Sequence, residues 1–382
     1  MNGLALGLRY SNQVNVLNPA SYSAIDSLTM IFDVGLSGQV TNFKEGGVKL
    51  NARNSDFEYA VAAFRIAPKV GLSLGIIPFT NIGYNYSSTS KVGNSTTTST
   101  GTYEGSGGLH QAYLGVGWSF FKNFSIGANL SYLWGSYDKS VSITSNDSYV
   151  NTYVKSYSTT VNSYKLDLGL QWEDKIYKDN WLAIGATYGV GHKLGADPEL
   201  SMSNTDQQTG KTSPTTYTVE NGLSIPTTYG IGLSWRHSDR FTIGADYTLQ
   251  KWGSLDFPTE DVGNNAYVMK SGLLSDRSKI VVGGEYIPNA QSRNLLNRIH
   301  YRVGASYATP YFKVNGMDGP KEYSVSAGFG IPIINRMNNR SILNISGQWS
   351  HASAKDLITE NTFRINIGIT FNEQWFMKWK VE

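Results

Sequence analysis

Apolar residues recur at every second position through most of the chain. In the block nearest the C-terminus, Phe363, Ile365, Ile367, Ile369 and Phe371 alternate with polar or small residues. A repeat of two indicates a β-strand with one apolar and one polar face, so the chain is predicted to be all-β. The pattern predicts fourteen strands, and the other thirteen cover residues 28–36, 57–66, 72–76, 112–120, 124–134, 164–172, 182–190, 229–235, 241–249, 280–286, 301–307, 323–331 and 343–349.

The connections between these blocks alternate in length, long and polar ones with generally short ones. The long ones include 87–108 and 195–220, and the short ones include 68–69, 122–123, 236–240, 289–297 and 335–340. Long loops at one end and short turns at the other are typical of an up-and-down outer-membrane barrel, with extracellular loops and both chain ends in the periplasm. We expect a transmembrane 14-stranded antiparallel β-barrel over residues 27–372, an N-terminal plug over 1–26 and a periplasmic tail over 373–382.

A soluble β-sandwich would also show alternating strands, but two features favour the barrel. In the block 124–134 the apolar face has Phe124 near one end and Tyr132 and Trp134 near the other. Ten residues at ~3.3 Å rise and ~45° tilt span about 23 Å, close to the ~25 Å apolar band of outer-membrane barrels. The opposite face of the strands is polar and rich in glycine, which suits a wall that lines a lumen.

Composition excludes several other classes of protein. Charged residues make up 16% of the chain, no run of about 20 apolar residues could form a spanning helix, and the absence of cysteine excludes disulfides and cysteine-ligated zinc. A net charge of +3 without long basic runs gives no support to nucleic-acid binding. The five histidines lack metal-ligand spacing, so we expect no metal and no cofactor.

We also expect no catalysis. Residues 71–75 match the G-x-S-x-G pattern of a hydrolase nucleophile elbow. An elbow requires a strand-to-helix turn, whereas this motif lies inside regular alternation.

Residues 1–26 precede the first strand and show no strand repeat, which makes them the candidate plug of a lumen that fourteen strands would leave wide. The alternative is a frayed tail. Asn18, Pro19 and Ala20 stand within this segment, a short spacer before the first strand. This element, its position and the strand count resemble the FadL family of long-chain fatty-acid transporters, in which an Asn-Pro-Ala element belongs to an N-terminal hatch. The start of the chain is short compared with that family, so ligand contacts made there by family members are not carried over.

The third strand contains Pro78, which removes one ladder hydrogen bond and should kink or open the sheet. Its neighbours Ile77 and Phe79 fall on the phase that otherwise points inward. The resemblance implies that a kink in the third strand opens the wall sideways, so that a hydrophobic ligand passes from the lumen into the bilayer. The alternative is a bulge without transport significance. A separate slip in phase near Ala62 and Ala63 predicts a bulge in the second strand.

Six ionisable residues fall on the inward phase. A lysine or arginine facing lipid near the midplane would cost ~2 to 4 kcal/mol, which enforces the inward orientation. We expect these residues to pair with one another and to bind the plug. In a functional interpretation Lys165, Arg302 or Arg364 meets a fatty-acid carboxylate. The six are Lys165, Asp167, Asp246, Glu285, Arg302 and Arg364.

These observations predict an integral outer-membrane channel for passive uptake of fatty-acid-like hydrophobic molecules, in contact with membrane lipid and lipopolysaccharide. The alternative is a FadL-like barrel that serves as a structural subunit of a larger outer-membrane complex for assembly, secretion or surface attachment. A general diffusion porin is a third possibility. The tail contains Trp375, Phe376 and Trp379 with two lysines, a composition that suits interfacial anchoring and equally a docking surface for a protein partner.

Overall fold

The computed structural model describes residues 1–45, 48–93, 96–261, 263, 266–314, 316–333, 341–354 and 358–374. The predicted turn at 335–340 and the aromatic tail from Trp375 onward lie outside the described residues. Strand β22 continues to Gln374, so the first two residues assigned to the tail belong to a strand.

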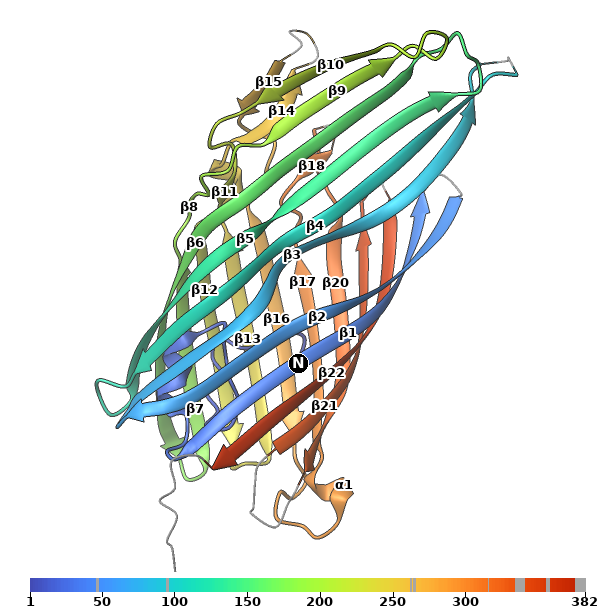
Figure 1. Cartoon of the computed structure of the whole chain (residues 1–382). Helices are drawn as coiled ribbons and strands as arrows, with labels where there is room; N and C mark the ends of the chain where they lie inside the picture. Colours follow the sequence, from blue (N-terminus) through green and yellow to red (C-terminus); the bar gives the residue numbers. More distant parts are fainter. Residues whose placement is uncertain are drawn as a thin grey trace, which may run out of the picture.

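Within the described residues, fourteen antiparallel strands close into one barrel (Figure 1). Neighbours in the chain pair in turn, the last strand pairs with the first, and the pairing of β6 with β7 completes the ring. The predicted number and order of strands are confirmed. The barrel strands are β1 (Thr29–Glu45), β2 (Val48–Ala67), β3 (Val70–Lys91), β4 (Thr98–Trp118), β5 (Phe124–Ser145), β6 (Thr152–Tyr177), β7 (Asn180–Gly189), β12 (Thr228–His237), β13 (Phe241–Gln250), β16 (Arg277–Tyr286), β17 (His300–Ala308), β20 (Lys321–Ile333), β21 (Ser341–Ser353) and β22 (Thr359–Gln374).

The other elements are short. Strands β9 and β10 form a hairpin that adds to the upper part of β6, and three further two-stranded sheets are β8 with β11, β14 with β15, and β18 with β19. Their bounds, with those of the helices, are β8 (His192–Lys193), β9 (Glu199–Thr205), β10 (Thr212–Thr218), β11 (Ser224–Ile225), β14 (Phe257–Asp261), β15 (Ala266–Lys270), β18 (Lys313–Val314), β19 (Met317–Asp318), the 3₁₀ helices η1 (Pro19–Ala24) and η2 (Trp252–Ser254), and the helix α1 (Leu295–Arg298).

The outer surface of the barrel is apolar and its inner surface is polar. On β5, Leu130 is 59% exposed while its neighbour Asn129 is 3% exposed, because successive side chains point to opposite faces of a strand. Phe124, the first residue of β5, and Tyr132 stand on the same outward face. In transmembrane barrels such an outward apolar band is the surface that meets lipid. No helix among the described residues is both long and apolar enough to cross a bilayer.

The predicted bulge at Ala62 and Ala63 is wrong in position. Both residues pair without interruption with β1 and β3. The register of β2 instead slips at Glu58, opposite Gly35 and Leu36, and again between Arg65 and Ala67. Alanine residues lie on both faces of β2 here, so apolar and polar positions do not alternate and the sequence does not show where the register slips.

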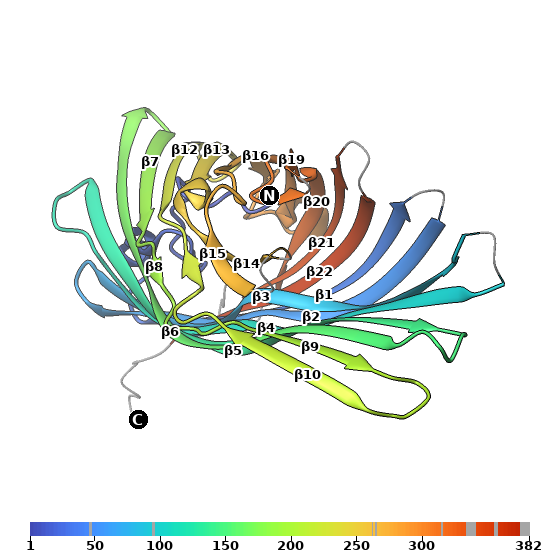
Figure 2. The same cartoon turned by 90° about the horizontal axis from the view of Figure 1, so that it is seen from above.

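The prediction of long loops between the strands is largely wrong, because most of these residues form β-strands. Strand β3 continues to Lys91 and β4 begins at Thr98, so most of the expected loop 87–108 is β-sheet. The upper parts of β3 to β6, joined by β9 and β10, extend as a sheet beyond the ring of the barrel (Figure 2). The strand repeat is hidden here, because Ser, Thr, Asn and Tyr residues occupy both faces of this sheet.

Candidate functional site

The N-terminal segment (residues 1–26) lies inside the barrel, near the end where the short turns join the strands (Figure 1). Its helix η1 contacts strands β2 to β6. The segment then leaves the lumen and enters β1, whose first residue pairs with Gln374 at the same end. This arrangement puts a folded peptide across the lower lumen.

Asn18, Pro19 and Ala20 are buried where η1 begins. The Asn18 side chain caps the helix by accepting a hydrogen bond from the Ala20 backbone N–H at 3.2 Å. Its amide nitrogen donates to the Leu6 carbonyl at 2.9 Å and to the Leu170 carbonyl of β6 at 3.3 Å. Pro19 occupies the first helical position, where its missing N–H costs no bond. The three-residue element therefore ties the segment to itself and to the wall.

Glycines on the lumen face allow this close approach. A methyl group added at Gly71 would lie 1.9 Å from the Tyr22 carbonyl oxygen. At Gly185 the corresponding distance is 1.8 Å to the Leu6 carbonyl oxygen, and at Gly169 it is 2.3 Å to Asn18 Oδ1. Any side chain at these wall positions would collide with the N-terminal segment.

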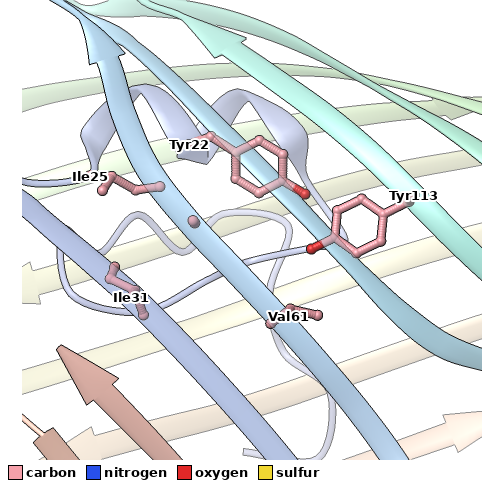
Figure 3. Close-up of a cluster of buried hydrophobic side chains, with 6 residues drawn as sticks. Tyr22, Ile25, Ile31, Val61 and Tyr113 are labelled. Carbon is pink, nitrogen blue, oxygen red and sulfur yellow. The ribbon is translucent and has the colours of Figure 1, made fainter. Parts of the chain in front are cut away.

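A buried cluster joins η1 to the wall (Figure 3). Tyr22 and Ile25 of the N-terminal segment pack with wall residues including Ile31, Val61 and Tyr113. The Tyr22 hydroxyl donates to Asn129 Oδ1 at 3.0 Å, and the Asn129 amide donates to the Val16 carbonyl at 3.0 Å. The apolar contacts and the hydrogen bonds fix the segment in one orientation.

Two further anchors were not expected from the sequence. Arg9 donates to Ser125 Oγ at 2.8 Å and to Ser23 Oγ at 3.0 Å. Gln171 of β6, fully buried, donates to the carbonyls of Leu6 and Leu8 at 3.1 and 3.0 Å. Arg9 stands in a segment without a repeat, and Gln171 looks like any inward polar residue, so neither carried a signal that could have marked it.

Three of the six inward ionisable residues lie close to the N-terminal segment. Asp246 accepts hydrogen bonds from the backbone N–H groups of Ala5 and Leu6 at 2.6 and 2.8 Å. Glu285, 4% exposed, forms an ion pair with Arg302 at 2.5 Å and lies 3.5 Å from the Tyr10 hydroxyl. The carboxylates of Asp246 and Glu285 thus bind the N-terminal segment and other residues of the barrel wall.

The other three lie apart from these. Lys165 and Asp167 pair with each other on β6. Arg364 donates to Gln39 Oε1 at 2.6 and 2.9 Å and approaches Glu58 at 3.5 Å. The structure therefore does not bring Lys165, Arg302 and Arg364 together into one cationic site. Among the described residues, no group of three or more histidines and carboxylates could hold a metal ion.

The wall is split beside the middle of β3. Strands β2 and β3 pair from Ala67 and Val70 up to Ala60 and Ile76, and no β2 residue above Ala60 in the described chain pairs with β3. Strand β3 remains paired with β4 throughout, with a register shift between Pro78 and Thr80 that leaves Phe79 as an extra residue. A bulge of this kind bends a strand and increases its twist. The upper part of β3 therefore turns away from β2 (Figure 1).

Glycines continue this bend into β4 and β5. Gly107 has φ +102° and Gly135 has φ +146°, values that L-residues with side chains rarely adopt. Gly108, opposite Asn81 of β3, would place a methyl group 2.4 Å from the Thr80 carbonyl oxygen. The bend thus crosses three adjacent strands, of which the sequence pattern marks only the proline of β3.

Ile77 and Phe79 flank the split on its inner side and belong to different apolar clusters. Ile77 packs against the cluster around Tyr22. Phe79 packs against a second cluster that includes Leu109, Leu133 and residues of the connection between β7 and β12. Within the split, the Asn81 amide of β3 donates to Asp56 Oδ1 of β2 at 2.6 Å. Apolar surface therefore lines the lower part of the split and polar surface its upper part.

A cavity of about 530 Å³ lies in the upper lumen, between β1 and β2 on one side and β16, β20 and β21 on the other. It borders the split at Gly83 and Tyr84. Most of its lining is polar, including Gln39, Asn54 and Gln348. The upper lumen is thus more polar than the lower part of the split, where Ile77 and Phe79 lie.

A closed barrel of fourteen strands with an apolar outer surface, and with an N-terminal segment folded into its lumen, defines a transmembrane β-barrel with the fold of the FadL-type channels. The CymD monoaromatic hydrocarbon channel has a TM-score of 0.66 at 13% identity, with 99% of this chain and 97% of that chain covered. The toluene transporter TbuX of Ralstonia pickettii has a TM-score of 0.60 at 15% identity, covering 94% and 92%. A FadL homologue of Pseudomonas aeruginosa has a TM-score of 0.65 at 14% identity, covering 96% of each chain.

The family model described as BamG matches residues 1–382, and the chain belongs to the BamG family. The expected likeness to FadL therefore holds for the fold, while the family is BamG. No curated relative matches the sequence.

Proposed function

We propose that this protein is an outer-membrane channel that admits small hydrophobic molecules from outside the cell and releases them sideways into the bilayer through the split beside β3. The observation that carries the proposal is the loss of pairing between β2 and β3 above Ala60, at the level where Pro78 and Phe79 interrupt the β3 ladder. The likeness in fold to hydrocarbon channels supports it.

The orientation follows from the same proposal. The long strands and hairpins face the outside, and the end with the short turns faces the periplasm. A hydrophobic molecule enters from the loop side, contacts Phe79 and Ile77, and leaves at the split without crossing water. The N-terminal segment below closes the aqueous route, and the inward carboxylates serve to hold it rather than to bind ligand.

The test is uptake of radiolabelled toluene and of a radiolabelled long-chain fatty acid by cells whose outer membrane lacks other channels of this fold. Replacing both Ile77 and Phe79 by Asp puts two charges at the inner mouth of the split, so uptake is expected to fall to background. The matched control replaces Tyr149 and Val150 by Asp, since both are exposed residues of the connection between β5 and β6. Unchanged uptake by a correctly folded double variant at the split would contradict the pathway.

A second function is favoured by the upper lumen. Its cavity is lined mainly by polar side chains, and burying an apolar ligand there would leave donors and acceptors unpaired. The sheet beyond the ring carries Tyr84 and Tyr86 with 37% and 41% of their surface exposed. Exposed tyrosines are enriched in protein interfaces. These features suit a structural subunit of a larger outer-membrane complex.

Native mass spectrometry of protein purified gently from its own outer membrane separates the two functions. A lone barrel with a reproducible adduct of lipid or hydrocarbon mass supports the channel. Stoichiometric protein partners and an empty lumen support the structural subunit. Loss of those partners when Tyr84 and Tyr86 are both replaced by Ala would connect the interaction to the extended sheet.

A further inference from the structure

The cavity of the upper lumen has the size of a small-ligand site. Its volume of about 530 Å³ falls within the roughly 300–1,000 Å³ of ordinary ligand pockets. Neutral hydrogen-bonding side chains make up much of its wall, including Gln39, Thr41, Asn54, Gln348, Ser350 and Thr362. Amides and hydroxyls both donate and accept hydrogen bonds, so this wall matches a ligand rich in both kinds of group.

Two aromatic residues, Phe43 and Tyr84, complete the lining from opposite sides of the split. Tyr84 lies 6.1 Å from Tyr86, which stacks on Tyr103 of β4 at 5.0 Å, measured between ring centroids. The aromatic row therefore leads from the extended sheet into the cavity. Aromatic rings offer flat apolar surfaces beside the polar groups, an arrangement that accommodates a molecule with C–H faces and hydroxyl edges.

The charged groups of the lining balance. Lys279 and Arg364 carry two positive charges, and Glu322 and Glu360 carry two negative charges. Arg364 is held by Gln39 and Glu58, and Glu322 is held by Arg277 at 3.3 Å. Such a site favours a neutral ligand over an anion or a cation, because a net charge would find as much repulsion as attraction.

The start of the N-terminal segment lies beside the cavity. Asn2 donates to Ser306 Oγ at 2.7 Å and accepts hydrogen bonds from Ser324 and Gln348 at 3.1 and 3.0 Å. Of these, Gln348 also lines the cavity.

We propose that this cavity binds a saccharide presented from outside the cell, with Tyr84 stacking on a sugar ring and Asn54 bonding its hydroxyls. A saccharide is neutral, rich in donors and acceptors, and has apolar ring faces, which is the chemistry of this lining. The residues that contact the saccharide differ from those that contact the hydrophobic molecule, since they belong to the polar upper lumen and not to the apolar lower part of the split.

The test is isothermal titration calorimetry of the full chain in detergent with four hexasaccharides: maltohexaose, cellohexaose, mannohexaose and chitohexaose. At least one is expected to bind with a stoichiometry near one. Tyr84→Ala and Asn54→Ala are each expected to weaken that binding at least tenfold. The matched controls are Tyr149→Ala, remote from the cavity, and Asn51→Ala, which lies on the opposite face of β2 because it is three residues from Asn54.

The controls are expected to change the affinity less than twofold. Absence of binding by all four saccharides overturns the proposal, as does binding that survives both cavity substitutions in folded protein. Folding is checked by the heat-dependent shift of the barrel in gel electrophoresis. Uptake of toluene or fatty acid is measured separately, so the failure of either proposal is recognised without reference to the other.

Discussion

A methyl group at Gly185 is expected to displace the N-terminal segment. The added carbon would lie 1.8 Å from the Leu6 carbonyl oxygen, so the segment has to move by about 1.6 Å to reach an ordinary contact of 3.4 Å. That carbonyl accepts hydrogen bonds from Asn18 at 2.9 Å and from Gln171 at 3.1 Å. The movement therefore disrupts two buried hydrogen bonds.

The cost can be worked out in two ways. Two neutral hydrogen bonds contribute about 0.5–1.5 kcal/mol each, which gives about 1–3 kcal/mol. Overpacking a well-packed site also costs typically about 1–3 kcal/mol. Because about 1.4 kcal/mol corresponds to a factor of ten, the Gly185→Ala variant should populate the displaced segment about 5 to 150 times more often than the wild type.

Single-channel conductance in a planar bilayer measures this population, because a displaced segment opens the wide lumen of a large barrel to ions. Gly38→Ala is the matched control, since the space around Gly38 is empty to 4 Å. Its opening frequency should equal that of the wild type. An unchanged opening frequency in folded Gly185→Ala protein would refute the conclusion that this contact holds the lumen closed.

Three other substitutions test the ion pairs and the lipid-facing surface. Glu285→Gln leaves Arg302 buried without its carboxylate and should lower the free energy of unfolding by about 3–5 kcal/mol, measured by urea titration of refolded barrel in lipid vesicles; a loss below 1 kcal/mol would be inconsistent with a buried pair. Leu130→Arg should cost about 2–4 kcal/mol in the same assay, and no cost would mean that Leu130 does not face lipid. The Lys251 side chain holds the pKa of Asp276 below its ordinary value of 3.8, with help from a backbone hydrogen bond. Its stabilising effect is present above pH 3.8 and is lost as the pH falls through the lowered pKa, so amide exchange of the adjacent backbone should accelerate in that range, and Asp276→Asn should abolish the pH dependence.

The strand repeat was sufficient to predict the barrel. Blocks such as 363–371 alternate because one face meets lipid and the other the lumen, and a change of one residue in register would reverse both faces. That physical constraint is enough to predict the number and order of the strands. It also predicts the short turns between strands in the described chain. Where both faces meet the same environment, as in the upper parts of β3 to β6, the constraint disappears, and the pattern predicts loops where the structure has strands.

The contacts of the N-terminal segment and the direction of the bend in β3 depend on the tertiary structure. Nothing in the sequence marks Arg9 or Gln171 as an anchor of the N-terminal segment, because their contacts join residues far apart in the chain. Pro78 was visible as a break, but the direction of the bend depends on the glycines of β4 and β5 that lie beside it only after the strands have paired.

The same distinction applies to the lumen. The alternation assigned Arg364 and Glu285 to the inward side, since lipid excludes charge, but it carried no information on which of them meet. In the folded barrel Glu285 is paired beside the N-terminal segment, while Arg364 borders the open cavity. The amino-acid pattern thus specifies which face of the wall each residue occupies, and the closure of the barrel specifies its neighbours, because pairing fourteen strands in one register brings distant segments to the same height.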